Sequence, residues 1–136
     1  MYRRIIVPTD GSEFAMKGVK EGLLMAKSLD RPATAIFVIE VGDIRVSEHI
    51  QQTLKKGAEK ALNEVEEEAK KIGVALEKKI FKGAPYKKIT DYADNDDIIY
   101  IASHGSSGFR ELFMGSTTDR VLKRANCTVA VVKGEE

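Results

Sequence analysis

The sequence predicts an α/β fold with a doubly wound five-stranded parallel sheet that carries helices on both faces. Right-handed crossovers restrict the strand order to a few possibilities, of which we expect 3-2-1-4-5. Two observations lead to this prediction. Five short apolar runs rich in β-branched residues alternate along the chain with segments whose apolar residues recur every three or four positions. Four of the five runs are continuous, which is typical of parallel strands covered on both faces. With 136 residues and no Pro/Gly/Ser linker, we expect one domain over residues 1–136.

The expected strands are short, and one of them differs from the rest. The third run alternates (Leu76, Lys78, Ile80), so we expect an edge strand with one solvent-exposed face. The five runs lie at Ile5–Val7, Ala35–Ile39, Val74–Phe81, Ile98–Ile101 and Val129–Val132.

The first two helical segments have clear end signals. Ser12 is a good N-cap just before the pattern that runs to Leu29. A longer pattern extends from Ile50 to Ile72 and stops at Gly73, a favoured residue just past a helix end.

The last two helical segments are shorter. Pro85 occupies a favoured first helical position. The fourth pattern runs over residues 116–125, and we expect Val121, Leu122 and Ala125 to face the sheet.

Charge and cysteine content exclude several function classes. The 22 basic and 21 acidic residues leave a net charge of +1, which argues against a dedicated nucleic-acid binder. The single cysteine, Cys127, excludes a disulfide framework and a zinc site built on paired thiolates. No apolar run reaches the length of a signal peptide or a membrane helix, so we expect a cytoplasmic protein that does not associate with membranes.

The first loop of interest follows the first strand, with the sequence Pro8-Thr9-Asp10-Gly11-Ser12. Taken alone, it reads as an N-cap turn. It also places a carboxylate and hydroxyl groups at the carboxyl end of a strand, where ligands of doubly wound sheets bind. A haloacid-dehalogenase-type phosphatase is excluded, because Pro8 stands where the nucleophilic aspartate would be.

The second loop follows the fourth strand and runs from Ala102 to Thr118. It contains three glycines and six hydroxyl side chains before a helix. Glycines let backbone amides approach an anion, and a helix N-terminus adds N–H donors and a positive dipole end. We interpret the stretch as a phosphate cradle, to which Ser116, Thr117 and Thr118 add hydroxyls; a plain mobile loop is the alternative. It matches neither the P-loop nor the dinucleotide-binding fingerprint.

Both loops are expected at one cleft, because strands one and four are neighbours at the point where strand order reverses. The convergence of two polar loops on that position is stronger evidence for a ligand site than either loop alone.

The chain resembles the universal stress protein family over essentially its whole length. The resemblance rests on residues 6–12, residues 97–105, the Gly115-Ser116 pair and the closing residues 126–132. The ATP-binding members carry a pattern of glycine, two residues, glycine, nine residues, glycine and serine or threonine. Gly105, Gly115 and Ser116 match it, whereas Ala102 replaces the first glycine, which could lower the affinity for nucleotide.

The resemblance implies an adenine nucleotide, ATP or else ADP or AMP, bound with Mg²⁺. Pro8, Thr9 and Asp10 would line the adenosine and metal side, with Asp10 as a metal ligand. The backbone of Val38 would recognise adenine. Ribose and phosphates would lie against the second loop, where the nucleotide-binding residues are Ala102, His104, Gly105, Gly108, Gly115, Ser116 and Thr117. His104 is also interpreted as a residue that shapes the glycine turn.

The resemblance further implies a homodimer that pairs through the last strand, Thr128 to Lys133. The sequence identifies no catalytic residue, so we expect a stress-response or signalling protein that binds ATP and hydrolyses it slowly, if at all. One alternative is a dimeric interaction module whose cleft is empty or binds AMP. A true ATP-cleaving enzyme is a further, weaker alternative.

Overall fold

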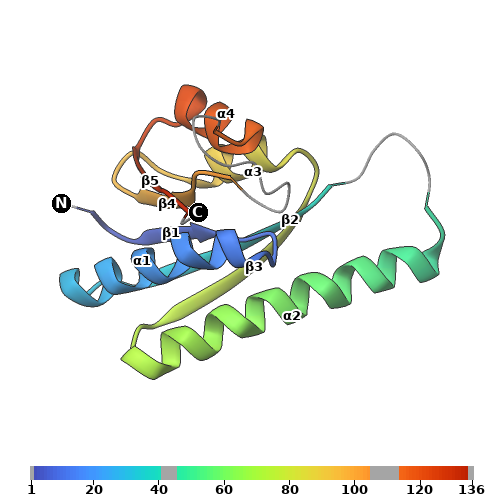
Figure 1. Cartoon of the computed structure of the whole chain (residues 1–136), viewed down its shortest axis with the longest axis horizontal. Coiled ribbons are helices and arrows are strands. Elements are labelled where there is room, and N and C mark those ends of the chain that lie inside the picture. Colours follow the sequence, from blue (N-terminus) through green and yellow to red (C-terminus); the bar gives the residue numbers. More distant parts are fainter. Residues whose placement is uncertain (1, 41–45, 105–113, 135–136) are drawn as a thin grey trace.

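The computed structural model describes residues 2–40, 46–104 and 114–134, and Gly105 and Gly108 therefore lie outside the described residues. Strands and helices alternate along the chain, as the sequence predicts (Figure 1). The strands are β1 (Ile5–Pro8), β2 (Ala33–Ile39), β3 (Leu76–Lys82), β4 (Ile98–Ala102) and β5 (Thr128–Val132). The helices are α1 (Glu13–Leu29), α2 (Glu48–Ile72), α3 (Pro85–Tyr92) and α4 (Ser116–Arg124).

The five strands form one parallel sheet in the order β3-β2-β1-β4-β5, which confirms the predicted topology. Strand β1 lies at the centre, and the strand order reverses between β1 and β4. Strand β3 is an edge strand, as expected from its mixed composition. Strand β5 is the other edge, so its valines are only half-buried even though the run is continuous in sequence.

Each face of the sheet carries its own apolar core. Helices α1 and α2 cover one face and helices α3 and α4 cover the other (Figure 1). Alternate residues of β1 serve the two cores: Ile5 and Val7 pack beneath α1 and α2, whereas Ile6 packs beneath α3 and α4. A central strand buried on both faces needs a continuous apolar sequence, and this is why Ile5-Ile6-Val7 has no polar residue.

The helix ends largely agree with the sequence signals. The Ser12 hydroxyl accepts a hydrogen bond from the backbone N–H of Ala15 at 3.1 Å, which caps α1. Gly73 ends α2 in the left-handed conformation, with φ of 75°. One expectation for α4 is wrong: Leu122 is 39% exposed, because Val121 occupies the sheet-facing position and the next residue is turned about 100° around the helix.

Helix α1 lies unusually close to β1 and β4 because it has glycines at two sheet-facing positions. A methyl group at Gly22 would lie 2.4 Å from Cγ1 of Val7 and 2.9 Å from Cβ of Tyr100. A methyl group at Gly18 would lie 2.8 Å from the backbone nitrogen of Ala102. The helix therefore contacts both strands directly, and its glycines fix the spacing of the layer that supports the carboxyl ends of β1 and β4.

At the amino-terminal ends of the strands, a buried carboxylate links the start of β1 to the start of β4. The carboxylate of Asp97 is fully buried and accepts hydrogen bonds from Nε and Nη2 of Arg4 at 3.0 and 3.1 Å. The backbone N–H of Asp94 donates to the same carboxylate at 2.8 Å. Asp94, Asp96 and Asp97 cluster closely enough to be considered as metal ligands, but Arg3 and Arg4 already pair with them.

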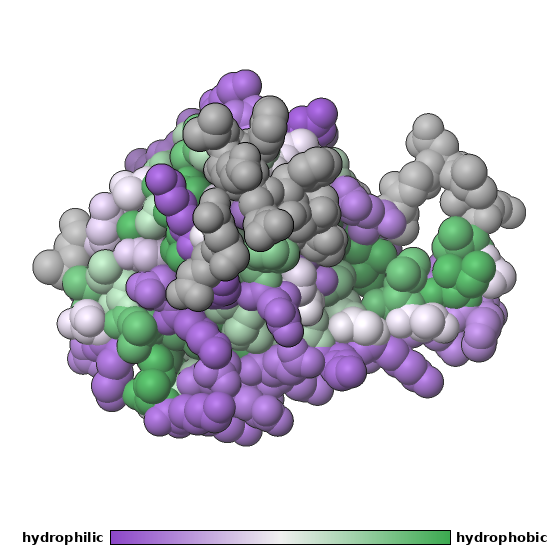
Figure 2. Space-filling model, viewed as in Figure 1, coloured by the Kyte–Doolittle hydropathy of each residue, from purple (hydrophilic) through white to green (hydrophobic). Residues whose placement is uncertain are grey.

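The face of the molecule in Figure 2 is largely hydrophilic but also carries exposed apolar residues, among them a group on α2. Figure 2 shows apolar residues gathered over the N-terminal part of this helix, which extends beyond the sheet. Ile50 and Leu54 are 46% and 40% exposed there. Among the described residues, none of the helices combines the length and apolar character needed to cross a membrane.

The glycine contacts lead to a test of the α1 packing. We expect Gly22→Ala to lower the free energy of unfolding by about 1–3 kcal/mol, because the added methyl group overlaps Val7 and Tyr100. The measurement is urea denaturation followed by circular dichroism. Gly57→Ala in α2 is the matched control: no atom lies within 4 Å of the new methyl group, so the better helix former should stabilise the protein by roughly 0.5–1 kcal/mol. Equal effects of the two substitutions would contradict the close packing of α1.

Candidate functional site

Toward the carboxyl ends of the strands, the pairing between the central strands β1 and β4 ends. Strand β1 pairs with β2 along its whole length, and the backbone N–H of Thr9 still donates to the carbonyl of Ile36 at 2.9 Å. On its other side, β1 pairs with β4 only at Ile5 and Ile6. Beyond that point, β1 and β4 are no longer paired, at the position where ligands bind to doubly wound sheets.

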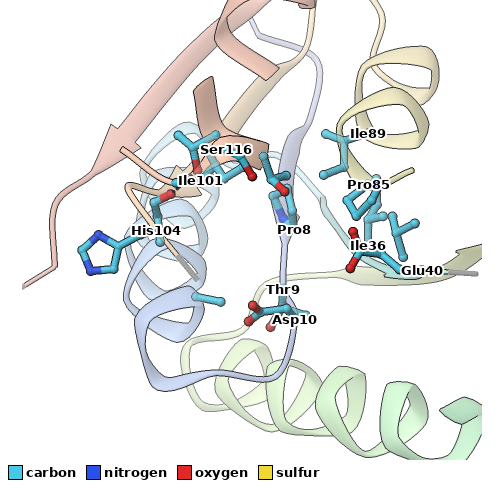
Figure 3. A pocket seen from close by; sticks show the side chains of 16 residues that line it. Pro8, Thr9, Asp10, Ile36, Glu40, Pro85, Ile89, Ile101, His104 and Ser116 are labelled. Carbon is cyan, nitrogen blue, oxygen red and sulfur yellow. Dashed lines mark hydrogen bonds between the residues drawn. The ribbon is translucent and has the colours of Figure 1, made fainter. Parts of the chain in front are cut away.

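A cavity of about 360 Å³ lies where this pairing ends (Figure 3). Its volume is within the range of small-molecule sites, roughly 300–1,000 Å³. The cavity brings together all of the predicted site residues that the structure describes. They are Pro8, Thr9, Asp10, Val38, Ala102, His104, Gly115, Ser116 and Thr117.

One side of the cavity is apolar. Ile36 and Val38 come from β2, and Pro85 and Ile89 come from the start of α3. Figure 3 shows Ile36, Pro85 and Ile89 on the same side, with Ser116 and Thr9 on the others. Such a surface can pack against a flat apolar ring.

The other side is polar and is formed by the start of α4. Gly115 is the N-cap and has no side chain with which to cap this helix, in contrast to Ser12 of α1. The backbone N–H of Gly115 donates to the carbonyl of Ser103 at 2.7 Å, which ties α4 to the end of β4. A methyl group at Gly115 would lie 3.1 Å from Cα of His104, so a larger residue here would press on the segment after β4. An uncapped N-terminus beside a cavity is suited to an anion.

Thr118 does not act as the sequence analysis expected. Its hydroxyl is buried and donates to the carbonyl of Ala102 at 2.7 Å. The expectation that this hydroxyl serves an anion is therefore wrong, because Thr118 lies on the sheet-facing side of the first helical turn. Its hydrogen bond instead fastens α4 to β4, although Thr118 still lines the cavity beside Ser116 and Thr117.

The loop after β1 is both a helix cap and a part of the cavity wall. Gly11 has φ of 85° and donates its N–H to Oγ1 of Thr9 at 3.0 Å. The backbone N–H of Ser12 donates to Oδ1 of Asp10 at 2.9 Å. The N-cap interpretation of this loop is therefore correct, and the same turn holds the exposed Asp10 carboxylate at the cavity.

The ring of His104 is turned away from Thr9 and Asp10 (Figure 3). It packs on Phe14 of α1, with 4.6 Å between ring centroids, and its Nδ1 lies 3.1 Å from Oγ of Ser103. The residue is 6% exposed, and its Nε2 has no hydrogen-bond partner in the described part of the chain. These contacts agree with a residue that shapes the turn after β4.

Cys127 is placed as a packing residue. It is half-buried and lies just before β5, not within the strand. Burial, and to a lesser degree the nearby carboxylate of Asp97, raises the pKa of the thiol above its usual value. A raised pKa lowers the thiolate fraction, so the residue serves as packing between β5 and the α3/α4 core.

Six residues that line the cavity were not predicted as site residues from the sequence. They are Ala15, Ile36, Glu40, Pro85, Ile89 and Ile101. Glu40 directly follows β2, and its position just past a strand was an available signal. Pro85 and Ile89 belong to a helix that starts from the loop after an edge strand, and only the packing of α3 on the sheet brings them to the cavity.

Comparison with known proteins agrees with this fold and site. A family model described as the universal stress protein family matches residues 1–133. Universal stress protein MJ0531 of Methanocaldococcus jannaschii is 31% identical over 141 residues, covering 98% of this chain and 83% of the relative. The solved structure of MJ0577, described as a hypothetical protein and a test case of structural genomics, superposes with a TM-score of 0.85. The two chains are 28% identical, and the superposition covers 100% of this chain and 99% of the chain of MJ0577.

Two further solved proteins share the fold and contain adenine nucleotides. A universal stress protein in complex with cAMP has a TM-score of 0.75 at 21% identity, covering 96% of this chain and 97% of its own. A family protein from Arabidopsis thaliana with AMP bound has a TM-score of 0.69 at 19% identity, covering 97% and 92%.

The hydroxyl of Thr118 provides a test of how α4 is anchored. We expect Thr118→Val to lower the free energy of unfolding by about 1–3 kcal/mol, because the shape is kept while the buried Ala102 carbonyl loses its partner. Thr117→Val, a similar substitution at a cavity-lining position, should change stability by less than about 0.5 kcal/mol. Thermal denaturation of both variants checks this expectation, and an unaffected Thr118→Val protein would disprove the anchoring role.

Proposed function

The chain belongs to the universal stress protein family, and from that premise we propose that it binds an adenine nucleotide in the cavity between β1 and β4. The observation that carries the proposal is the cavity itself, which has an apolar side and, opposite, the uncapped N-terminus of α4. A nucleotide has the same two-part character, a flat base and an anionic phosphate group. The adenine nucleotides in the cAMP and AMP complexes of the same fold make adenine the base to test.

The base would lie against Ile36, Val38, Pro85 and Ile89. The backbone direction of Val38 supports this placement. The carbonyl of Ile36 accepts from Thr9, so alternate residues of β2 direct their backbone groups toward β1. The backbone N–H and C=O of Val38 therefore point to the side of β1, but β1 has ended at this level, so these groups face the cavity. One N–H and one C=O side by side complement the acceptor N1 and the donor amino group of adenine.

The phosphates would lie at the start of α4. Gly115, Ser116 and Thr117 line the cavity there, and a helix N-terminus stabilises an anion by about 0.3–1 kcal/mol or more through its N–H groups and dipole. The family resemblance implies that Gly105 and Gly108 belong to the same group of residues. Ala102 and His104 complete the turn that leads from β4 into this region.

ATP with Mg²⁺ is our leading choice among adenine nucleotides. The donor set fits a magnesium ion held by one protein carboxylate and phosphate oxygens, since Asp10 presents an exposed carboxylate at the cavity. When bound, the ion would neutralise phosphate charge. Asp10 is the residue that would hold it.

We propose binding, not rapid turnover, as the activity of this site in a stress-response or signalling protein. The site residues are assigned to binding and positioning, and the His104 ring faces α1 instead of the Asp10 side of the cavity. Slow hydrolysis of ATP is compatible with this proposal. An interaction module whose cleft is empty or holds AMP is the second candidate, favoured by the alanine at the first position of the glycine pattern.

We also propose that the protein is a homodimer that pairs through β5. This strand is a sheet edge with half-buried valines, and unpaired strand edges in proteins are commonly covered. The carbonyl of Val132 accepts from Ser103 of the neighbouring segment, so Val129, Val131 and Lys133 direct their backbone groups outward. Two copies related by a two-fold axis would pair these groups antiparallel.

Nucleotide binding is tested by calorimetric titration of the wild-type protein with AMP and with ATP plus Mg²⁺. We expect Gly115→Asp to weaken binding at least about tenfold, since an aspartate N-cap would occupy the N–H groups meant for phosphate and would repel it. Because the same aspartate caps α4, the fold should survive, although the new side chain is tight against His104. Gly115→Ala is the matched control and reports the steric effect alone.

The outcomes separate the candidates. Binding of ATP only with Mg²⁺ supports the leading choice, and binding of AMP alone supports the second candidate. No binding of either nucleotide to the wild-type protein would refute the proposal, and unchanged affinity in Gly115→Asp would place the phosphates elsewhere.

The dimer is tested with two substitutions at Lys133. Lys133→Pro removes one outward N–H, twice in a symmetric pair, and leaves the β4–β5 ladder intact, so we expect the dimer dissociation constant to rise about tenfold or more. Lys133→Ala keeps the N–H and should leave the dimer unchanged. Light scattering coupled to size-exclusion chromatography gives the mass. A wild-type mass equal to one chain would overturn the dimer proposal.

A further inference from the structure

The backbone groups of β1 alternate between its two neighbours in a fixed order. The N–H of Ile5 donates to Pro32 at 3.1 Å and the N–H of Thr9 donates to Ile36 at 2.9 Å, so odd-numbered residues face β2. The carbonyl of Arg4 accepts from Ile98 at 3.2 Å, so even-numbered residues face β4. The backbone groups of residue 8 therefore point toward β4.

Pro8 has no N–H to give at this position. Continuing the parallel ladder, the N–H of residue 8 would donate to the carbonyl of Tyr100. The pairing of β1 with β4 stops one step earlier, at Ile6 and Ile99. Strand β4 itself continues to Ala102, which still pairs with β5 on the other side. The interruption is therefore confined to the β1 side, where the donor is missing.

The two strands remain close together at the level of the missing bond. Val7 and Tyr100 both contact the same glycine of α1, at the position where a methyl group would lie 2.4 and 2.9 Å from their side chains. A donor at position 8 would thus have an acceptor within reach. The cavity begins at this level, since its lining includes Pro8 from β1 and Ile101 and Ala102 from β4.

We propose that Pro8 is a positioning residue that interrupts the β1–β4 ladder and so keeps the cavity between these strands open. The proline acts by what its backbone lacks, in addition to the ring surface that it presents to the cavity. Its effect on ligand binding rests on the function proposed above, whereas its effect on the ladder does not.

The proposal that the missing N–H of Pro8 interrupts the ladder is tested with a substitution that restores this N–H. In Pro8→Ala, we expect the new amide to bond to Tyr100, so that hydrogen exchange of the position-8 amide, measured by NMR, slows by about tenfold or more relative to an unbonded amide. Pro85→Ala is the matched control. It removes a proline from the same cavity lining, but the restored N–H lies at the first position of α3, where backbone donors have no intrahelical partner. The position-85 amide of that variant should therefore exchange fast.

The effect of Pro8 on ligand binding is tested by measuring the affinity for AMP and for ATP with Mg²⁺. A net hydrogen bond corresponds to roughly 2- to 10-fold in an equilibrium constant, and the ligand must break that bond to enter, so affinity in Pro8→Ala should fall by about this factor. The loss should exceed that in Pro85→Ala, which measures the effect of removing one proline ring from the lining.

Each outcome decides the proposal. Slow exchange of the position-8 amide together with the larger affinity loss supports it. Fast exchange of that amide overturns it whatever the affinities are, and slow exchange with unchanged affinity shows that the ladder does not control the cavity. If the wild-type protein binds neither nucleotide, the proposed function fails and the exchange rates alone decide whether Pro8 interrupts the ladder.

Discussion

The central strand β1 is hydrogen-bonded on both sides at its start and only to β2 at its end, and the rest of the structure is arranged around that change. A buried strand normally satisfies its backbone groups with a neighbour on each side. Where β4 no longer pairs with β1, the space between them is bordered by the loops that follow both strands. The turn after Pro8 and the start of α4 thus come together, although they lie near opposite ends of the sequence.

The two ends of the sheet are held in opposite ways. At the amino-terminal edge, Arg4 and Asp97 form a buried, two-pronged ion pair that links the start of β1 to the start of β4. Loss of one partner of such a pair is costly, so these strands are held together at this end. At the carboxyl end, α1 contacts both strands through Gly18 and Gly22 without joining them to each other. The strands therefore lose their pairing at one end only, which places the cavity at that edge.

Much of the fold could be predicted from local patterns. The alternation of strands and helices predicts a doubly wound parallel sheet and restricts its strand order to a few possibilities. Ser12 and Gly73 mark helix ends by the chemistry of their own side chain and backbone. Residues whose role depends on the packing of one element against another were not predictable. Leu122 and Thr118 differ from expectation because the rotation of α4 on the sheet is set by tertiary contacts. Pro85 and Ile89 reach the cavity for a similar reason, since only the packing of α3 on the sheet brings them there.

The charge of the cavity explains how a nearly neutral chain can accommodate an anion. Among the described lining residues, the acidic side chains are Asp10 and Glu40, and lysine and arginine are absent from that group. Attraction of phosphate to this part of the wall must therefore come from backbone N–H groups, hydroxyls and the dipole of α4, which act at short range. The same carboxylates would repel a bare polyphosphate, and would repel it less when a bound cation offsets part of its charge. If the proposed function is correct, the two carboxylates therefore favour a nucleotide whose charge is partly offset by a cation over a free one.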